Sequence, residues 1–114
     1  MIIKRGDLFL ANLEPTKGAE QGRIRPVIII QNNIFNNYSP TTIVVPITSK
    51  IPNKKYLTSV IISKQDSKLK KDSTILTNQI RTIDKGRIIR RLGILNNEIM
   101  NKVDLAIKIS LGLN

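Results

Sequence analysis

Cysteine and histidine are both absent from this chain of 114 residues. Without cysteine there are no disulfides, no thiolate catalysis and no cysteine-based zinc site. Without histidine the chain lacks the commonest metal ligand and the usual acid–base group at neutral pH. Aspartate and glutamate together number only eight. We therefore expect neither a metal nor a cofactor, and an enzyme made from this chain should work without them.

Acidic residues are few beside 19 lysines and arginines, which leaves a net charge of +11 and a pI near 10.4. Such a charge favours a polyanionic partner, more often nucleic acid than an anionic membrane. The alternative is a highly soluble basic protein without a polyanionic ligand. Eight basic residues lie in residues 1–57 and 11 in residues 58–114, so the charge belongs to a folded surface rather than to a tail.

Long apolar runs are also missing. No run approaches the roughly 20 residues that span a bilayer, and the first residues hold no apolar stretch of the kind found in a signal peptide. We expect a cytoplasmic protein that does not bind membranes, and the length predicts a single domain over residues 1–114.

Short apolar segments separated by turn residues fill the first two thirds of the chain and predict a small β-barrel or sandwich. Two long polar segments, residues 14–22 and 32–40, are expected to be loops and are candidates for a functional site. The expected strands are Asp7–Leu13, Pro26–Gln31, Thr42–Ile47, Ser59–Ser63, Thr74–Thr77, Gln79–Ile83 and Arg87–Leu92.

The period changes from Asn96 onward, and Asn96 or Asn97 is suited to cap a helix. On a helical wheel, Asn101, Asp104 and Lys108 form a narrow polar stripe, and most of the remaining circumference is apolar. A helix on the surface of one domain needs an apolar stripe of only about 100°. Two apolar sides therefore predict a helix that packs on its own sheet and also on a second copy, giving a homodimer. The alternative is a helix buried in a cleft of its own domain.

Two strand ends carry polar side chains suited to an anion. Pro26 holds the preceding Arg25 in an extended conformation, and a guanidinium there offers a planar fork of donors for a phosphate. Thr48 and Ser49 follow Pro46 and add hydroxyl groups. The alternatives are a surface arginine without a partner and hydroxyl groups that cap a turn.

A third candidate is the basic segment from residue 79 to residue 91. Strand alternation would place Gln79, Arg81 and Ile83 on one face, and a second set on another, namely Arg87, Ile89 and Arg91. Such a stripe can follow a phosphate backbone. The lysines at positions 68, 70 and 71 and at positions 50, 54 and 55 are expected to be solvated loop charges.

Four motifs in order resemble one known family, the MazF/PemK toxin endoribonucleases. They are Arg5-Gly6-Asp7, then Pro15-Thr16-Lys17-Gly18-Ala19-Glu20-Gln21 leading into Arg25-Pro26-Val27, then Pro46-Ile47-Thr48-Ser49, and Gln79-Ile80-Arg81-Thr82-Ile83-Asp84-Lys85. The resemblance covers nearly the whole chain. It implies a mainly β protein with α, an SH3-like (PemK-like) β-barrel with a C-terminal helix, that acts as a homodimer. It also implies cleavage of single-stranded RNA at short motifs without metal, and inhibition by a cognate MazE-like antitoxin.

The resemblance assigns roles to individual residues. Arg25 and Thr48 occupy the catalytic positions, and Glu20 matches an acid associated with the site. Two departures, Asn78 where relatives usually have Glu and Ala19 where they usually have Ser, bear on base preference. The residues expected to bind RNA are Gln21, Gly22, Ser49, Asn78, Gln79, Arg81 and Arg87.

Chemistry without metal is natural for RNA, because its own 2′-hydroxyl can attack the adjacent phosphorus and leave a 2′,3′-cyclic phosphate and a 5′-hydroxyl. Arg25 would stabilise the extra charge and act more easily as the acid than as the base, since a guanidinium stays protonated at neutral pH. Glu20 would serve as the base, or would instead orient Arg25 through an ion pair. Two other functions stay open: a non-catalytic nucleic-acid-binding barrel and a gyrase-directed toxin of the same fold.

Overall fold

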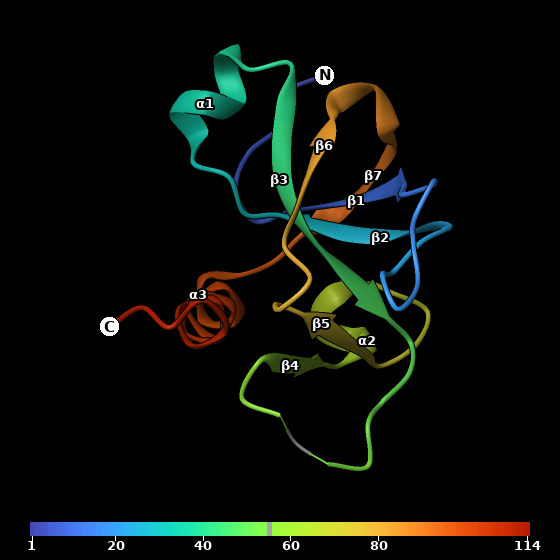
Figure 1. Cartoon of the computed structure of the whole chain (residues 1–114), viewed down its shortest axis with the longest axis vertical. Helices are drawn as coiled ribbons and strands as arrows, with labels where there is room; N and C mark the ends of the chain where they lie inside the picture. The colour runs from blue at the N-terminus through green and yellow to red at the C-terminus, as the bar shows by residue number, and fades with distance from the viewer. Residues whose placement is uncertain (55) are drawn as a thin grey trace.

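The computed structural model describes residues 1–54 and 56–114, and it confirms a mainly β architecture with a C-terminal helix (Figure 1). The elements in chain order are β1 (Asp7–Asn12), β2 (Ile24–Ile29), α1 (Asn33–Tyr38), β3 (Thr41–Thr48), β4 (Ser59–Ile62), α2 (Lys64–Ser67), β5 (Ser73–Leu76), β6 (Arg81–Asp84), the 3₁₀ helix η1 (Lys85–Arg87), β7 (Ile88–Ile94) and α3 (Asn97–Leu111).

The strands form one antiparallel sheet in the order β4-β5-β3-β2-β1-β7, with β6 paired to β3 off this path. The long strand β3 divides its pairing, because Thr41–Val44 pair with β6 and Ile47–Thr48 pair with β5. Within the described residues no ladder joins β4 to β7, so the barrel-like sheet is not closed. Strand β4 pairs with β5 and strand β7 pairs with β1, which leaves β4 and β7 at the two ends of the strand order.

Apolar side chains fill both faces of the central strands. Leu8, Ile28 and Val45 belong to a core that includes the buried side of α3. Their chain neighbours Phe9, Val27 and Val44 belong to a second core on the opposite face. Successive residues of a strand point to opposite faces, so apolar runs such as residues 27–30 reflect burial on both sides.

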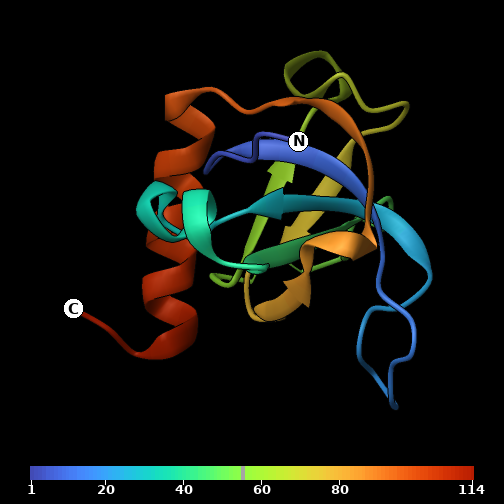
Figure 2. The same ribbon diagram turned by 90° about the horizontal axis from the view of Figure 1, so that it is seen from above.

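The C-terminal helix α3 runs along one side of the sheet (Figure 2). The Asn96 side chain accepts a hydrogen bond from the Ile99 N–H at 2.9 Å, and Gly112, with φ of +70°, ends the helix in the left-handed conformation that glycine favours. Val103 is fully buried, whereas Leu105 is 61% exposed. The two apolar sides expected from the wheel are therefore present. Among the described residues, no helix is long and apolar enough to cross a membrane.

The segment expected to be a polar loop at residues 32–40 contains helix α1. The Asn32 side chain caps it by accepting from the Phe35 N–H at 3.0 Å. Asn36 is buried and is satisfied by Gln31 and by the Thr42 hydroxyl, which donates to its Oδ1 at 2.9 Å. Polar composition hides this helix from sequence patterns, since its buried contact is a hydrogen-bonded amide rather than an apolar side chain.

Two strand boundaries differ from expectation in the basic segment. Strand β6 begins at Arg81, so Gln79 lies before it, and Arg87 belongs to η1 rather than to β7. The Asp84 side chain accepts from the Gly86 N–H at 2.7 Å and so caps η1. Because Gln79 and Arg87 are outside the strands, the expected alternation of these residues along one face is wrong.

Candidate nucleic-acid interface

Arg25 and Thr48 lie across from each other at the end of the β2–β3 ladder. The ladder pairs Val27 with Pro46, and the same register continued by two residues places Arg25 opposite Thr48. The two side chains also share one face of the sheet, because each is two positions from a member of that pair. Both are half-buried. Residues 23 apart in sequence thus lie opposite each other at the end of this ladder.

The guanidinium of Arg25 is oriented by the chain just before it. Its Nε donates to the Gly22 carbonyl oxygen at 2.6 Å, which leaves the terminal nitrogens directed elsewhere. Burial, and secondarily the positive charge of Arg23, lower the pKa of Arg25 from its ordinary value. No salt bridge joins Arg25 to Glu20 in the described part of the chain, so the ion pair considered as one role for Glu20 is not formed.

Arg25 and Thr48 line a hollow of about 790 Å³ whose charged side chains are all basic. Its apolar lining includes Leu69 and Leu92. We call it the basic hollow. Its basic residues are Arg23, Arg25, Lys50, Lys68, Lys70, Lys71, Arg90 and Arg91. Of these, Arg91 is paired with the buried Asp7, whose Oδ1 lies 2.9 Å from Nη1, and that hydrogen-bonded carboxylate raises the pKa of Arg91.

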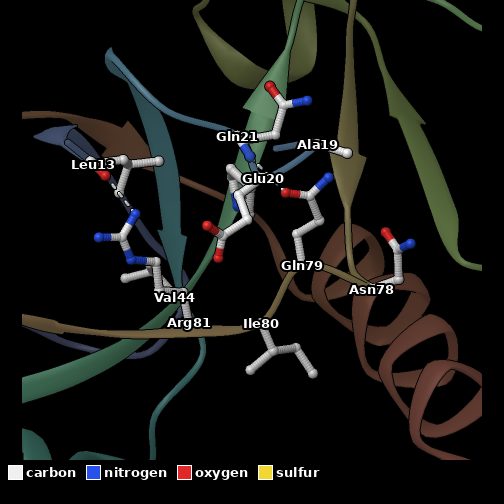
Figure 3. A pocket seen from close by; sticks show the side chains of 10 residues that line it. Leu13, Ala19, Glu20, Gln21, Val44, Asn78, Gln79, Ile80 and Arg81 are labelled. Carbon is white, nitrogen blue, oxygen red and sulfur yellow. Dashed lines mark hydrogen bonds between the residues drawn. The ribbon is translucent and has the colours of Figure 1, made fainter. Parts of the chain in front are cut away.

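A second hollow of about 400 Å³ carries most of the other expected site residues (Figure 3). We call it the amide hollow, because the side-chain amides of Gln21, Asn78 and Gln79 line it together with Glu20 and Arg81. The Gln21 N–H donates to Oε1 of Gln79 at 2.8 Å. Along β3, Pro46 lines the amide hollow and Thr48 the basic hollow, so the two are neighbours.

Two arginines expected to contact RNA hold the loop between β1 and β2. Arg81 donates to the Leu13 carbonyl oxygen, and Figure 3 shows this bond as a dashed line. Arg87 donates to the carbonyl oxygens of Asn12 and Glu14. A guanidinium supplies five donors, so these bonds leave each arginine able to make further contacts. In this structure both arginines shape the loop that carries Glu20.

Gly22 lies close to two side chains of the same loop. A Cβ at this position would meet Oε1 of Glu14 and Oγ1 of Thr16. The Glu14 carboxylate accepts a hydrogen bond from the Arg23 N–H. A larger residue at position 22 would therefore make the ends of these two side chains move, and the contact of Glu14 with the Arg23 N–H would be disturbed.

The expected site residues are therefore divided between two adjoining hollows. Arg25, Thr48 and Ser49 line the basic hollow. The amide hollow holds Glu20, Gln21, Asn78, Gln79 and Arg81. Gly22 and Arg87 line neither hollow but support the loop between β1 and β2. Glu20 itself is exposed and accepts a hydrogen bond from the Lys17 N–H.

Sequence patterns did not assign the lysines at positions 50, 68, 70 and 71 to the site, and all four line the basic hollow. Lys54 is exposed and does not line either hollow, and Lys55 lies outside the described residues. Arg90, which belongs to the candidate segment 79–91, lines the basic hollow as well. No local signal distinguishes these lysines from ordinary surface charges, because only the tertiary structure brings the segment after α2 and the segment after β3 to the same hollow. Among the described residues, no three acidic side chains gather in a way that could hold a metal ion.

The fold and the site define a class: a small antiparallel β protein with a C-terminal helix and a hollow whose charged side chains are basic. Residues 4–111 match the family described as the PemK-like, MazF-like toxin of type II toxin-antitoxin system. The match spans nearly the whole chain, and the chain belongs to this family.

Solved structures share the fold at low sequence identity. MazF from Deinococcus radiodurans superposes with a TM-score of 0.84 at 23% identity, covering 99% of each chain. An endoribonuclease from a mycobacterial species gives 0.81 at 23% identity, covering 99% of this chain and 94% of that one. A MazE–MazF complex from Deinococcus radiodurans gives 0.79 at 20% identity over 100% of both chains.

Proposed function

We propose that this chain is the toxin of a type II toxin–antitoxin system and a sequence-specific endoribonuclease that cuts single-stranded RNA without metal. The observation that carries the proposal is the placement of Arg25 opposite Thr48 at the edge of a hollow whose charged side chains are all basic. Membership in the MazF-like toxin family supports it. A structural neighbour named as an endoribonuclease supports the activity.

The reaction we propose is attack by the RNA 2′-oxygen on its own phosphorus. A bond forms between the 2′-oxygen and phosphorus, the bond from phosphorus to the 5′-oxygen breaks, and the products are a 2′,3′-cyclic phosphate and a 5′-hydroxyl. Arg25 and Thr48 would donate hydrogen bonds to the phosphorane oxygens, where negative charge develops. Removing one such preorganised donor typically costs about 3 kcal/mol of transition-state stabilisation.

Arg25 is also our candidate for the acid that protonates the leaving 5′-oxygen. Burial lowers its pKa, and a lower pKa makes transfer of a proton from the guanidinium less costly. Its bond to the Gly22 carbonyl holds the terminal nitrogens in a fixed direction. Exchange with solvent would restore the proton after each turnover.

We assign the 2′-hydroxyl proton to Glu20, which is the only carboxylate among the described residues that line either hollow. In the RNA-free structure Glu20 lines the amide hollow, next to the one that holds Arg25. Bound RNA that passes from one hollow into the other would bring its 2′-hydroxyl between them. The amides of Gln21, Asn78 and Gln79 would then contact bases, because amides supply both donors and acceptors.

We propose two protein partners. The exposed side of α3 would bind a second copy of the chain to form a homodimer, since Leu105 and Ile109, one turn apart on that side, are both exposed. A cognate MazE-like antitoxin would carry an acidic segment that competes with RNA for the basic surface, and one structural neighbour is a MazE–MazF complex. A toxin that cuts mRNA would act in the cytoplasm.

Incubation of a long unstructured RNA with the protein in excess EDTA tests the proposal. We expect discrete cuts with 2′,3′-cyclic phosphate ends from the wild type, and none from Arg25→Ala or Thr48→Ala protein that is confirmed to be folded. RNA that is bound but intact would indicate a non-catalytic nucleic-acid-binding protein. RNA that is neither cut nor bound, together with binding to gyrase, would indicate a gyrase-directed toxin.

A further inference from the structure

Two sets of basic residues can be distinguished among those that the structure describes. Members of the first set are bonded to acceptors of the protein itself and therefore serve the fold. Arg5 pairs with Asp104, and Arg91 pairs with Asp7. The other three donate to backbone carbonyl oxygens: Arg81 to that of Leu13, Arg87 to those of Asn12 and Glu14, and Lys85 to that of Asn36.

The second set lies in the basic hollow. Within the described part of the chain, no side-chain hydrogen bond or salt bridge engages the charged heads of these residues. They are Arg23, Lys50, Lys68, Lys70, Lys71 and Arg90, and all six are exposed. Like charges gathered without counter-charges repel one another, and a bound polyanion relieves that repulsion.

The loop that presents three of these lysines has a defined shape. Lys68 takes a left-handed conformation with φ of +60° at the end of α2, and its N–H donates to the Lys64 carbonyl at 3.0 Å. The Leu69 N–H donates to the buried Ser67 hydroxyl oxygen at 3.2 Å, and the Leu69 side chain packs against the core. The backbone that carries Lys68, Lys70 and Lys71 is therefore fixed relative to the sheet.

The hollow is continuous with the Arg25–Thr48 pair, because those two residues line it together with the lysines. We propose that Lys68, Lys70, Lys71 and Arg90 bind phosphates of the RNA strand beyond the nucleotides at the cut, so that the substrate site is longer than the cleaved motif. This inference rests on the proposed function, which places the scissile phosphate between Arg25 and Thr48. A strand held there continues covalently, and its next phosphates enter the region where charges are unpaired.

RNA suits this hollow better than an acidic peptide does. Half-buried apolar side chains, Leu10, Leu69 and Leu92, lie between the charges. They offer surfaces for riboses and base faces, whereas the carboxylates of an acidic peptide would need only the charges. The amides and hydroxyls suited to sequence readout gather in the amide hollow and beside Thr48. The lysine-rich end should therefore bind the backbone without regard to sequence.

The test measures binding of fluorescein-labelled 2′-O-methyl RNA of mixed sequence, 6 and 20 nucleotides long, which cannot be cleaved because it lacks the 2′-hydroxyl. Lys70→Gln/Lys71→Gln is compared with wild type and with Lys4→Gln/Lys108→Gln, a control of equal charge change on exposed residues outside the hollow. Thermal melting of each variant establishes that it is folded.

We expect Lys70→Gln/Lys71→Gln to bind the 20-mer about tenfold more weakly at 0.1 M salt and the 6-mer within twofold of wild type. The slope of log K against log salt should fall by about 1.4, since each single-strand phosphate contact contributes ~0.7. An equal loss in the Lys4→Gln/Lys108→Gln control would overturn the inference, because it would indicate net charge alone.

Unchanged binding of the 20-mer by Lys70→Gln/Lys71→Gln would also overturn the inference. If this variant then bound a poly-glutamate peptide more weakly than wild type does, the hollow would be assigned to an acidic protein partner. The inference and the proposed function fail separately. RNA cleavage by wild type with unchanged 20-mer binding in Lys70→Gln/Lys71→Gln removes only the inference. Lost 20-mer binding in that variant, with no cleavage by wild type, supports the extended site and removes only the nuclease activity.

Discussion

The backbone N–H of Gln21 donates to Oε1 of Gln79 at 2.8 Å, although 58 residues separate the two in the chain. This bond ties the loop between β1 and β2 to the segment that precedes β6. It joins the two sides of the amide hollow. Glu20 directly precedes Gln21 in the chain, so this hydrogen bond also restrains the position of Glu20. The shape of the candidate site therefore depends on a contact between two glutamines.

Replacing Gln79 with leucine should loosen this loop. One hydrogen bond contributes about 1 kcal/mol net, so we expect a small fall in melting temperature and a larger fall in RNA cleavage. Trypsin should cut faster after Lys17 and Arg23, both exposed in the loop. The control is Gln65→Leu in α2, which is exposed and lies outside both hollows. Equal tryptic rates in wild type and Gln79→Leu would contradict the tether.

Arg81 has two separable roles to test. Its bond to the Leu13 carbonyl predicts that Arg81→Met destabilises the fold by about 1–3 kcal/mol, since the acceptor beside the buried Leu13 side chain loses its partner. Urea unfolding measures this loss. If Arg81 also contacts RNA, the salt slope of binding should fall by ~0.7. A stability loss with an unchanged salt slope would show that Arg81 only shapes the loop.

Arg25 should be expendable for folding and essential for cleavage. Because burial lowers its folded pKa below the unfolded value, the folded state disfavours the charge, and this penalty persists through neutral pH, where both states are protonated. Arg25→Met should therefore melt at or above the wild-type temperature while cleavage falls by roughly 100-fold or more.

Arg91 provides the contrasting substitution. Its partner Asp7 is only 1% exposed, so Arg91→Met should leave a buried carboxylate short of a donor and lower stability by about 1–2 kcal/mol. Thermal melting of the two variants side by side tests the difference. Greater destabilisation by Arg25→Met than by Arg91→Met would contradict both assignments.

The exposed apolar side of α3 predicts a change in oligomeric state. Leu105→Glu places a charge on the proposed homodimer surface and should give a monomer of normal stability in light scattering after size-exclusion chromatography. Asn101→Glu, on the polar stripe of the same helix, introduces the same charge and should leave the dimer intact. A wild-type chain that is already monomeric would remove the homodimer from the proposal.

Several features followed from local pattern alone. Apolar runs such as residues 27–30 predicted strands, and a capping asparagine at residue 96 or 97 with two apolar sides predicted α3 and its exposed apolar side chains. These predictions succeed because hydrophobic periodicity and capping act within a few residues. Helix α1 was missed for the complementary reason. Its burial depends on Asn36 meeting Thr42, which is a tertiary hydrogen bond.

The candidate site shows the same division. The sequence by itself determined the net charge, the lack of histidine and cysteine, and the Arg-Pro and Pro-x-Thr motifs that place Arg25 and Thr48 at strand ends. Only the tertiary structure, through the pairing of β2 with β3, placed these two residues opposite each other. It also divided the remaining candidates between two hollows and joined Lys70 and Lys71 to the Arg25 side. The reason is physical: composition and local pattern reside in neighbouring residues, whereas a surface is assembled from strands and loops far apart in the chain.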